Sequence, residues 1–311
     1  MLVVLTQKMT QWQGDDTILA VIIKSSSERA FCAGGDIRSL YKNRHLRFNQ
    51  PHPFFSVEYE FNRFLYHFKK PYVAFCNGMT MGGGVGISIH GSHRIASDSM
   101  VWAMPETKIG FFPDVGVSYY LAKCPDFVGY YLALSGHSID AETARLLGLV
   151  DFIVPDQSWA LCEEKIVSAD LTHAPFKKIS RILASFQSDK NLSALQEYFP
   201  LINRCFSLNS LPAIFNALEL EDCDWGKQLL VDLYQRAPLS LKITYQQLNR
   251  VVGMSLDEVI AQDTGLVHHF LQGHDFYEGA RALIVDKDNT PLWKPERMDQ
   301  VTETMVEHYF Q

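Results

Sequence analysis

Two acidic residues, Glu106 and Asp114, lie in a segment (residues 103–116) that otherwise consists mainly of Met, Ile, Phe, Pro and Gly. Carboxylates are rarely surrounded by apolar residues without a partner, because the burial of an unpaired charge is costly. An apolar environment also raises the pKa of a carboxyl group towards the range that is useful for proton transfer. These two acids are therefore the first candidates for catalytic residues.

The backbone of this segment is interrupted by four residues that disfavour a continuous helix: Pro105, Gly110, Pro113 and Gly116. We expect a rigid, kinked loop that presents both acids, followed by a helix that begins near Val115. Asp114 then stands where the N-cap residue of that helix would be. A purely structural role stays open for Asp114, as does an ordinary loop position for Glu106.

A glycine cluster at residues 82–86 is the second candidate site. It follows a predicted strand at residues 71–76 and precedes an apolar run that ends at Ile89. Glycines at the start of a buried helix leave backbone N–H groups unshielded near the positive end of the helix dipole. Such groups can bind an anion or a developing oxyanion. Tight packing of a helix on a sheet requires glycine as well, so both interpretations stay open.

Two further acids, Asp36 and Glu58, lie on predicted helices. Residues 30–37 predict a strand end that turns, through two glycines, into a helix with Asp36 near its start. Residues 54–68 carry apolar side chains three or four positions apart, which predicts an amphipathic helix. A solvated helix face is the simpler interpretation of Glu58. The polar and basic residues 38–49 predict a mobile surface loop.

The rest of the chain divides into a part with predicted strands and a part without. Before residue 155, the remaining predicted segments are helices at residues 3–12, 119–121 and 141–147 and strands at residues 18–23, 94–96 and 149–154. From residue 156 onward, the pattern predicts helices at residues 159–167, 176–186, 226–236, 240–251, 256–271 and 276–284. We therefore expect an α/β core at residues 1–155 and a packed helical region at residues 156–311.

Length and composition are typical of a soluble globular protein, with 311 residues, 47% hydrophobic and 20% charged. The net charge of −7 argues against nucleic-acid binding as the main function. The six cysteines are scattered without a Cys-x-x-Cys pair, which favours free thiols in a reducing compartment. No apolar run reaches membrane-spanning length, and the first residues lack the features of a secretory signal. We expect a cytoplasmic protein that does not bind membranes.

Common cofactor and nucleophile motifs are not matched by this sequence. The glycine cluster does not satisfy G-x-G-x-x-G, because position 87 is Ile, and the chain has no phosphate loop of the Walker type. Ser88 narrowly misses the G-x-S-x-G elbow of serine hydrolases, since His90 replaces the last glycine. The adjacent His268 and His269 point to different faces of a helix and suit a metal poorly. We expect neither a metal nor a separate cofactor.

Four blocks of the sequence resemble the enoyl-CoA hydratase/isomerase (crotonase) superfamily, at residues 30–37, 70–74, 78–86 and 104–116. Within it, the chain is most similar to the 3-hydroxyisobutyryl-CoA hydrolase branch. The segments that carry this finer resemblance are residues 82–86, 105–107, 112–116, 273–282, 286–288 and 293–295. The resemblance implies an α/β fold, a crotonase-type spiral of β-β-α units with a C-terminal helical region.

The resemblance also implies a ligand and roles for particular residues. The ligand is an acyl-CoA thioester, whose carbonyl oxygen would be bound by the backbone N–H groups of Gly35 and Gly83. Hydratases of this superfamily use two glutamates, and here the second is present as Glu106 while the first position is Gly86. A residue without a side chain cannot transfer a proton, which weighs against water addition to a double bond. The hydrolase branch has acids at the positions of Asp114 and Glu58, which match.

The function that this resemblance implies is the hydrolysis of 3-hydroxyisobutyryl-CoA to 3-hydroxyisobutyrate and CoA, as in valine breakdown, with coenzyme A present as part of the substrate. Glu106 would attack the thioester carbonyl or activate a water molecule that does. Asp114 would orient the β-hydroxyl of the acyl group or hold Glu106, and Glu58 would line the acyl pocket. The alternatives are an enoyl-CoA hydratase or isomerase that uses Glu106 alone, and a non-catalytic acyl-CoA-binding protein.

The resemblance leaves the beginning of the chain and the oligomeric state open. Family members usually carry a pair of strands before the first helix, and this chain begins at what would be that helix. We expect those strands to be truncated or absent, and with them a part of the nucleotide end of the CoA site. Relatives often form trimers through their helical tails, so a homo-oligomer is one expectation and a tail folded back on its own core is the other.

Overall fold

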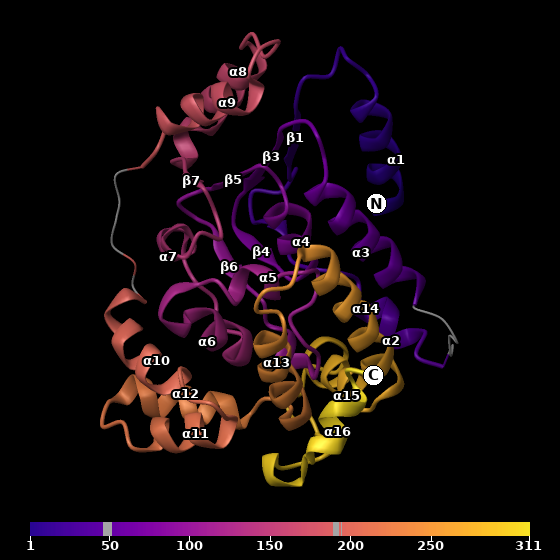
Figure 1. The fold of residues 1–311 in the computed structure, drawn as a ribbon, viewed down its shortest axis with the longest axis vertical. Helices are drawn as coiled ribbons and strands as arrows, with labels where there is room; N and C mark the ends of the chain where they lie inside the picture. The colour runs from indigo at the N-terminus through magenta and orange to yellow at the C-terminus, as the bar shows by residue number, and fades with distance from the viewer. Residues whose placement is uncertain (46–51, 189–192, 194) are drawn as a thin grey trace. The chain divides into compact units, whose positions relative to one another are not determined.

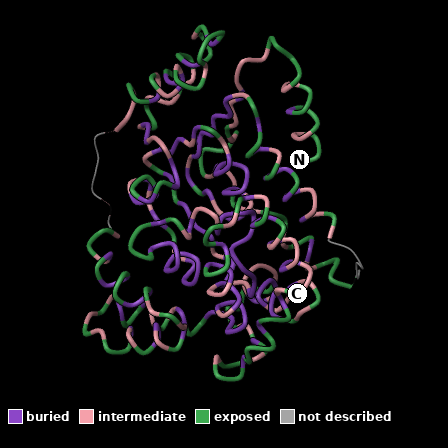
Figure 2. The backbone as a smooth tube through the Cα atoms, in the orientation of Figure 1, coloured by how far each residue is buried: buried purple, intermediate pink, exposed green. Residues whose placement is uncertain are grey.

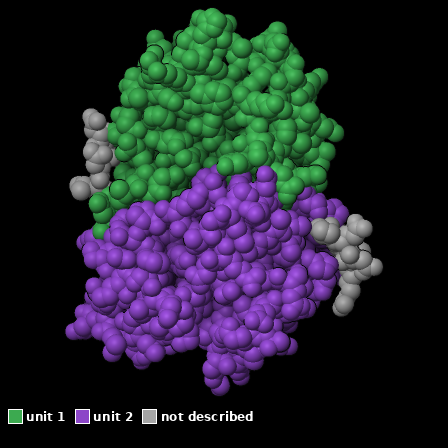
Figure 3. Space-filling model, viewed as in Figure 1, with its two compact units in different colours: residues 1–34, 57–103, 139–196 green, residues 35–56, 104–138, 197–311 purple. Residues whose placement is uncertain are grey.

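The computed structural model describes residues 1–45, 52–188, 193 and 195–311. The chain forms two compact units, which Figure 3 distinguishes by colour. Unit 1 comprises residues 1–34, 57–103 and 139–196, and unit 2 comprises residues 35–56, 104–138 and 197–311. The described strands end at Ile153, so the described residues after 155 contain helices and no strands, as expected. As a domain boundary, residue 155 stays a prediction.

The strands of unit 1 form two parallel sheets (Figure 1). The first has the order β1 (Val21–Lys24), β3 (Tyr72–Cys76), β5 (His93–Ala96) and β7 (Phe152–Ile153). The second has the order β2 (Ala30–Cys32), β4 (Met79–Met81) and β6 (Val101–Ala103). Strand β3 lies between two neighbours, with Val73 opposite both Ile22 and His93. All its residues are buried, which explains its continuous apolar sequence.

The helices that belong wholly or mainly to unit 1 are α1 (Leu2–Gln13), α3 (Pro53–Tyr66), α4 (Gly83–Ile89), α7 (Ala141–Leu146), α8 (Trp159–Val167) and α9 (Pro175–Ala184), with a 3₁₀ turn at Asp156–Ser158. Helices α8 and α9 pack on the first sheet. Cys162 and Ile179 from these helices share a buried cluster with Val73 and Ile95 of the sheet. Helix α4 contacts β2 and β4 of the second sheet and is buried along most of its length (Figure 2).

Unit 2 is helical within the described residues. Its α-helices are α2 (Ile37–Lys42), α5 (Ser118–Leu121), α6 (Val128–Ser135), α10 (Phe199–Phe206), α11 (Leu211–Glu219), α12 (Asp224–Tyr234), α13 (Pro238–Arg250), α14 (Leu256–Gln272), α15 (Asp275–Ala280) and α16 (Glu303–His308). Shorter 3₁₀ turns are η1 (Glu106–Ile109) and those at Pro125–Phe127, Gln196–Tyr198 and Met298–Gln300, and a π-helical turn, η5 (Arg281–Val285), follows α15. Every residue of α6 is buried (Figure 2).

The predicted helices and the strands β1, β3 and β5 are confirmed, with boundaries that shift by a few residues. The sequence did not predict β4, β6, α6, α10, α11 and α16. The strand expected at residues 149–154 shortens to Phe152–Ile153. The prediction of a loop at residues 38–49 is wrong for residues 38–42, because α2 extends to Lys42. Residues 46–49 lie outside the described part of the chain.

The helix expected to begin near Val115 is α5, which begins at Ser118. Val117 holds its N-cap position, and no side chain caps it. The interpretation of Asp114 as an N-cap is therefore wrong. Asp36 does cap α2, since its side chain accepts a hydrogen bond from the Ser39 N–H at 2.9 Å.

Candidate active site

Three of the predicted site residues follow the strands of the second sheet in the sequence. Its parallel strands β2, β4 and β6 are neighbours, so their carboxyl ends lie at one edge of the sheet, where α/β proteins commonly bind ligands. From these ends the chain continues within a few residues to Gly35 after β2, Gly83 after β4 and Glu106 after β6. Gly83 and Glu58 belong to unit 1, whereas Gly35, Glu106 and Asp114 belong to unit 2.

The glycine cluster of unit 1 serves both packing and the exposure of backbone N–H groups. A Cβ atom on Gly84 would lie 2.1 Å from the carbonyl oxygen of Cys32, so this position needs glycine for the approach of α4 to β2. Gly83 is the first residue of α4, a position whose N–H has no acceptor inside the helix. Gly34 lies beside it, since a Cβ on Gly34 would be 3.9 Å from the Gly83 nitrogen. The packing interpretation of the cluster is thus supported by Gly84, and the binding of an oxyanion by the Gly83 N–H stays a prediction.

Glu58 is buried on α3, with 6% of its surface exposed, so the expectation of a solvated position is wrong. Asn62, one helical turn later on the same face, donates from Nδ2 to the carbonyl oxygen of Gly86 at 2.9 Å and links α3 to α4. Burial raises the pKa of the Cys32 thiol, and the charge of Glu58 raises it further. Glu58 thus lies on the side of α3 that faces the glycine-bearing elements of unit 1.

Gly35 occupies a tight position in unit 2. A Cβ on Gly35 would lie 2.5 Å from the ring of Phe54, so any other residue would displace this side chain. The Gly35 carbonyl accepts a hydrogen bond from the Ile37 N–H at 2.9 Å. Within the part of the chain that the structure describes, the N–H groups of Gly35 and Gly83 donate no hydrogen bond. Both amides therefore remain available to a ligand oxygen.

Glu106 begins η1 and is buried, with 7% of its surface exposed. The turn ends at Gly110, which adopts a left-handed conformation with a φ of 69°. The N–H of Phe111 donates to the Glu106 carbonyl at 3.0 Å and closes the turn. The Thr107 hydroxyl donates to the carbonyl oxygen of Leu134 at 3.0 Å, which fixes the turn to the end of α6. The expected kinked loop is therefore confirmed, with a single 3₁₀ turn at its centre.

The C-terminal segment packs against η1 through two glycines. A Cβ on Gly279 of α15 would lie 2.3 Å from the carbonyl oxygen of Ile109. A Cβ on Gly110 would lie 2.4 Å from the carbonyl oxygen of Asp275. The backbones of η1 and α15 thus touch directly on both sides. The position of the turn that carries Glu106 depends on a segment more than 160 residues away in the sequence.

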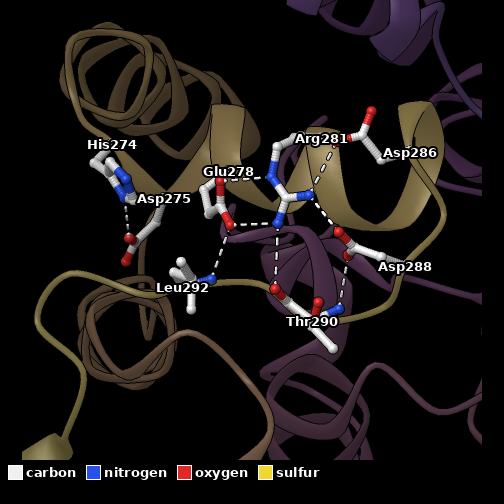
Figure 4. Close-up of polar contacts among 8 residues, drawn as sticks. All are labelled: His274, Asp275, Glu278, Arg281, Asp286, Asp288, Thr290 and Leu292. Atoms are coloured by element: carbon white, nitrogen blue, oxygen red, sulfur yellow. Dashed lines mark hydrogen bonds and ion pairs between the residues drawn. The ribbon is translucent and has the colours of Figure 1, made fainter.

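An ion-pair network holds the end of α15 and the chain that follows it (Figure 4). The guanidinium of Arg281 lies between three carboxylates, with Glu278 and Asp286 each at 3.0 Å and Asp288 as the third partner. The N–H of Leu292 donates to Glu278 at 2.9 Å. Its three acidic partners raise the pKa of Arg281, so the cation is permanent.

The same segment is linked to the helix that follows Gly35. Arg38 of α2 donates from Nη2 to the carbonyl oxygen of Ile284 in η5 at 2.7 Å. Asp275 at the start of α15 accepts a hydrogen bond from the Lys294 N–H at 2.8 Å, and burial raises the pKa of its carboxyl group. The C-terminal segment therefore contacts both the helix after Gly35 and the turn of Glu106.

Asp114 is buried, with 5% of its surface exposed, in a turn that two distant side chains hold. The N–H of Gly116 donates to Oδ2 of Asp263 on α14 at 2.8 Å. The side-chain amide of Gln247 on α13 donates to the carbonyl oxygen of Pro113 at 3.0 Å and to Oδ1 of Asp263 at 2.9 Å. Burial raises the pKa of Asp263 well above its usual value, and the nearby charge of Asp114 raises it further.

Sequence reasoning missed Asp263, Gln247, Asn62 and Arg281. A signal for Asp263 was present, because it stands on the apolar face of α14 at the spacing of the buried residues Leu256, Val259, Ile260, Leu266, Val267 and Phe270. An acid on the buried stripe of an amphipathic helix indicates a partner. Asn62 stands in a similar place between the buried Phe61 and Leu65. Nothing in the local sequence indicated the partners of either residue.

Three further features of the described residues concern a pocket, a possible metal site and membrane-spanning helices. A pocket of about 440 Å³ in unit 1 is lined by residues 24–28 with Asn77, Ser99, Asp156 and Trp159, none of which is a predicted site residue. No group of three or more His, Cys, Asp or Glu side chains in the described ranges could hold a metal ion. Within the same ranges, no helix combines the length and the apolar character that crossing a membrane would need.

Comparison with known proteins identifies relatives along nearly the whole chain. Residues 1–310 match the model of the enoyl-CoA hydratase/isomerase family. The chain is 35% identical over 308 residues to the mitochondrial 3-hydroxyisobutyryl-CoA hydrolase of Mus musculus, which covers 97% of this chain and 80% of that protein. It is 38% identical over 306 residues to the protein of the same name from Xenopus laevis, with 96% and 78% covered.

Solved structures confirm the expected fold. The structure of a carnitinyl-CoA dehydratase from Mycobacterium thermoresistibile matches with a TM-score of 0.92 and 30% identity, over 100% of this chain and 88% of that one. An enoyl-CoA hydratase from Rhodobacter sphaeroides 2.4.1 matches with a TM-score of 0.84 and 29% identity, over 100% and 89% of the two chains. The family model and the relatives above agree with these matches. The chain therefore belongs to the enoyl-CoA hydratase/isomerase family.

Proposed function

We propose that this protein is a thioester hydrolase that converts 3-hydroxyisobutyryl-CoA to 3-hydroxyisobutyrate and CoA. Curated relatives that are 34–38% identical over at least 96% of this chain carry the name 3-hydroxyisobutyryl-CoA hydrolase. The names of the solved structures instead include a dehydratase and a hydratase. Their activities, addition or removal of water at a carbon–carbon double bond, are the second candidate. The choice between the two activities depends on the acids at the site.

The observation that carries the proposal is the glycine at position 86. Hydratases of the superfamily place a glutamate there, directly after the glycine cluster, beside the one that corresponds to Glu106. Here Gly86 is buried within α4, and its carbonyl oxygen accepts the hydrogen bond from Asn62. No side chain at this position can donate or accept a proton, so the glycine cluster supplies no second catalytic glutamate. Hydrolysis requires a single carboxylate to act on the thioester carbonyl, which Glu106 can provide.

The proposed mechanism assigns the polarisation of the thioester to backbone amides. The N–H groups of Gly35 and Gly83 would bind the carbonyl oxygen and stabilise the negative charge that develops on it, and removal of one such donor typically costs on the order of 10²–10³ in rate. Asp114 would bind the β-hydroxyl of the acyl group, and Glu58 would line the acyl pocket. The burial of all three acids supports these roles, because an enclosed carboxylate keeps its interactions with a polar ligand strong.

Two routes are open to Glu106. In the first, its carboxylate attacks the carbonyl carbon, the C–S bond breaks, CoA leaves as a thiolate that takes up a proton, and water hydrolyses the resulting anhydride. In the second, Glu106 removes a proton from a water molecule that attacks the same carbon, the C–S bond breaks, and CoA leaves as a thiolate that takes up a proton. Repeated turnover in H₂¹⁸O distinguishes them. Label in the Glu106 carboxylate, or a trapped acyl-enzyme, supports the first route. Label confined to the product, with no acyl-enzyme trapped, supports the second.

The assay that tests the proposal compares two reactions of the full chain. Release of free thiol from 3-hydroxyisobutyryl-CoA, without hydration of crotonyl-CoA, is the expected result. Hydration alone would establish the hydratase or isomerase activity instead. Binding of both thioesters without either reaction would leave a non-catalytic acyl-CoA-binding protein.

Glu106→Gln is the substitution that tests the catalytic assignment. It keeps the size of the side chain but removes its charge, so thiol release is expected to stop while the protein remains folded. Glu219→Gln changes an exposed glutamate in α11 and is the matched control, for which normal rates are expected. Near-normal thiol release by Glu106→Gln would show that another group performs the reaction.

Location and assembly stay predictions. The relatives are named as mitochondrial proteins, so their names do not support the cytoplasmic location that the composition predicts for this chain. A homo-oligomer and a monomer with a folded-back tail are both still to be tested by the mass of the protein in solution.

A further inference from the structure

The turn that carries Asp114 has a backbone that its own sequence disfavours. Val115 has a φ of 54° and Gly116 a φ of 72°, so two consecutive residues adopt the left-handed region. Glycine reaches this region without strain, whereas a β-branched residue such as valine rarely does. Strained conformations of this kind persist only where the surrounding structure holds them. The turn therefore needs contacts from outside its own segment.

Those contacts come from α13 and α14, which hold the turn on both sides of Asp114. Asp263 accepts the Gly116 N–H after Asp114, and Gln247 donates to the Pro113 carbonyl before it, at 2.8 Å and 3.0 Å. The same Gln247 amide donates to Asp263 at 2.9 Å, so the two holding residues form one unit. Asp263 and Gln247 have no exposed surface. A displacement of either side chain would release one end of the turn.

A carboxylate is an unfavourable choice for a purely structural contact at this place. Its burial is costly, and the neighbouring charge of Asp114 adds to the cost, because both effects raise the pKa of Asp263. Well-packed apolar side chains commonly stabilise a core as well as buried charges do, or better. Asp263 accepts two hydrogen bonds, from Gly116 and from Gln247, despite the cost of its burial. This arrangement is understandable if the exact position of the turn matters to the site.

We propose that Asp263 is a positioning residue that sets the place of the Asp114 carboxylate and thereby the preference of the enzyme for acyl groups with a β-hydroxyl. This inference rests on the proposed function, in which Asp114 binds that hydroxyl. Asp263 does not contact the substrate in this account. It accepts a hydrogen bond from the Gly116 N–H, and it accepts one from Gln247, which also donates to the Pro113 carbonyl. These bonds fix the backbone on both sides of Asp114 and so restrict its carboxylate to one position.

The test compares kcat/KM for 3-hydroxyisobutyryl-CoA with kcat/KM for isobutyryl-CoA, which lacks the hydroxyl. The ratio of the two values does not depend on the fraction of enzyme that is folded, so a merely structural defect leaves it unchanged. Asp114→Ala defines the loss of preference when the hydroxyl contact itself is removed, because alanine has no side-chain hydrogen-bond acceptor. Asp263→Ala is expected to lower the ratio by about tenfold or more, since a misplacement of about 1 Å can cost roughly 10²-fold. Asp263→Asn, which keeps an acceptor for Gly116, is expected to fall between Asp263→Ala and the wild type.

Ser240→Ala is the matched control, because Ser240 lies fully buried on α13 and its hydroxyl has no hydrogen-bond partner among the described residues. Its ratio is expected to equal that of the wild type. If Asp263→Ala does not fold, Gln247→Met removes the link to both Asp263 and Pro113 at similar side-chain length and is expected to lower the ratio as well.

Three results would count against the inference, and they are distinguishable. An unchanged ratio in the Asp263 and Gln247 variants, with a lowered ratio in Asp114→Ala, overturns the positioning role alone. An unchanged ratio in Asp114→Ala overturns the contact between Asp114 and the hydroxyl and leaves hydrolysis intact. A wild-type protein that hydrolyses neither thioester overturns the proposed function itself.

Discussion

Gly279→Ala is the most informative single substitution in this protein, because it adds one methyl group at the contact between the C-terminal segment and η1. The new Cβ would lie 2.3 Å from the carbonyl oxygen of Ile109 and 2.4 Å from its carbon. Real Cβ atoms essentially never come within 3.0 Å of a backbone atom. Either η1, which begins with Glu106, or α15 must therefore move by about 1 Å, a displacement that can cost roughly 10²-fold in rate when it occurs at catalytic groups.

The effect on stability can be estimated from two opposing contributions. Replacement of glycine by alanine inside a helix stabilises it by roughly 0.5–1 kcal/mol. Overpacking against a rigid backbone typically destabilises by about 1–3 kcal/mol. The clash dominates at Gly279, so we expect a lower free energy of unfolding for Gly279→Ala.

Gly265→Ala provides the matched control. Gly265 lies inside α14, and a Cβ there would meet nothing within 4 Å among the described residues. The same chemical change should then stabilise the protein by roughly 0.5–1 kcal/mol and leave kcat unchanged. The two substitutions are thus expected to differ in the sign of their effect on stability.

The measurements are the free energy of unfolding in urea and kcat for thiol release from 3-hydroxyisobutyryl-CoA. We expect Gly279→Ala to lower both, and kcat by about 10²-fold. If the variant loses stability but keeps a normal kcat, then α15 has moved and η1 has not. That result would refute the claim that the C-terminal segment determines the position of Glu106.

Two further substitutions test charged residues of unit 2. Arg281→Met leaves Glu278, Asp286 and Asp288 without the cation between them, so we expect a lower Tm at pH 7 and a smaller decrease at pH 4, where carboxylates are partly protonated. Arg297→Met, which breaks an exposed pair with Asp299, is the control, and an equal decrease in Tm for both would contradict a special role of the Arg281 network. For Asp263, whose pKa is raised in the folded state, the wild type is expected to lose stability as the pH rises from about 4 towards the folded-state pKa, by at most about 1.4 kcal/mol per pH unit. Asp263→Asn removes this titration, so its free energy of unfolding relative to the wild type should rise with pH, and a difference that is constant across this range would show that Asp263 does not titrate there.

Local pattern in the sequence was sufficient for the longer elements and for the location of the acids. Helix α14 was predicted because its apolar residues repeat at helical spacing. Strand β3 was predicted because a strand that is buried on both faces has a continuous apolar sequence. The segment with Glu106 and Asp114 was identified by the contrast between its acids and its apolar neighbours, and both acids are buried.

The pattern of apolar and polar residues did not predict the short strands or the fully buried helix. Strands β4 and β6 have three residues each, which is too few to show alternation. They are strands because each pairs with a neighbour in the sheet, β4 with β2 and β6 with β4. Helix α6 is buried on all sides, so its sequence has no polar face that would indicate a period. In both cases the neighbours in space, and not the residues themselves, decided the structure.

The sequence by itself determined that the protein has two acids in an apolar, kinked segment, a glycine cluster at the start of a buried helix, and the blocks that identify its family. Only the tertiary structure decided which distant residues fix the positions of these segments. Asp263 lies 147 residues from Gly116, and Gly279 meets Ile109 across a similar length of chain. Hydrogen bonds and backbone contacts of this kind depend on distances in space, and the local periodicity of a sequence contains no information about them.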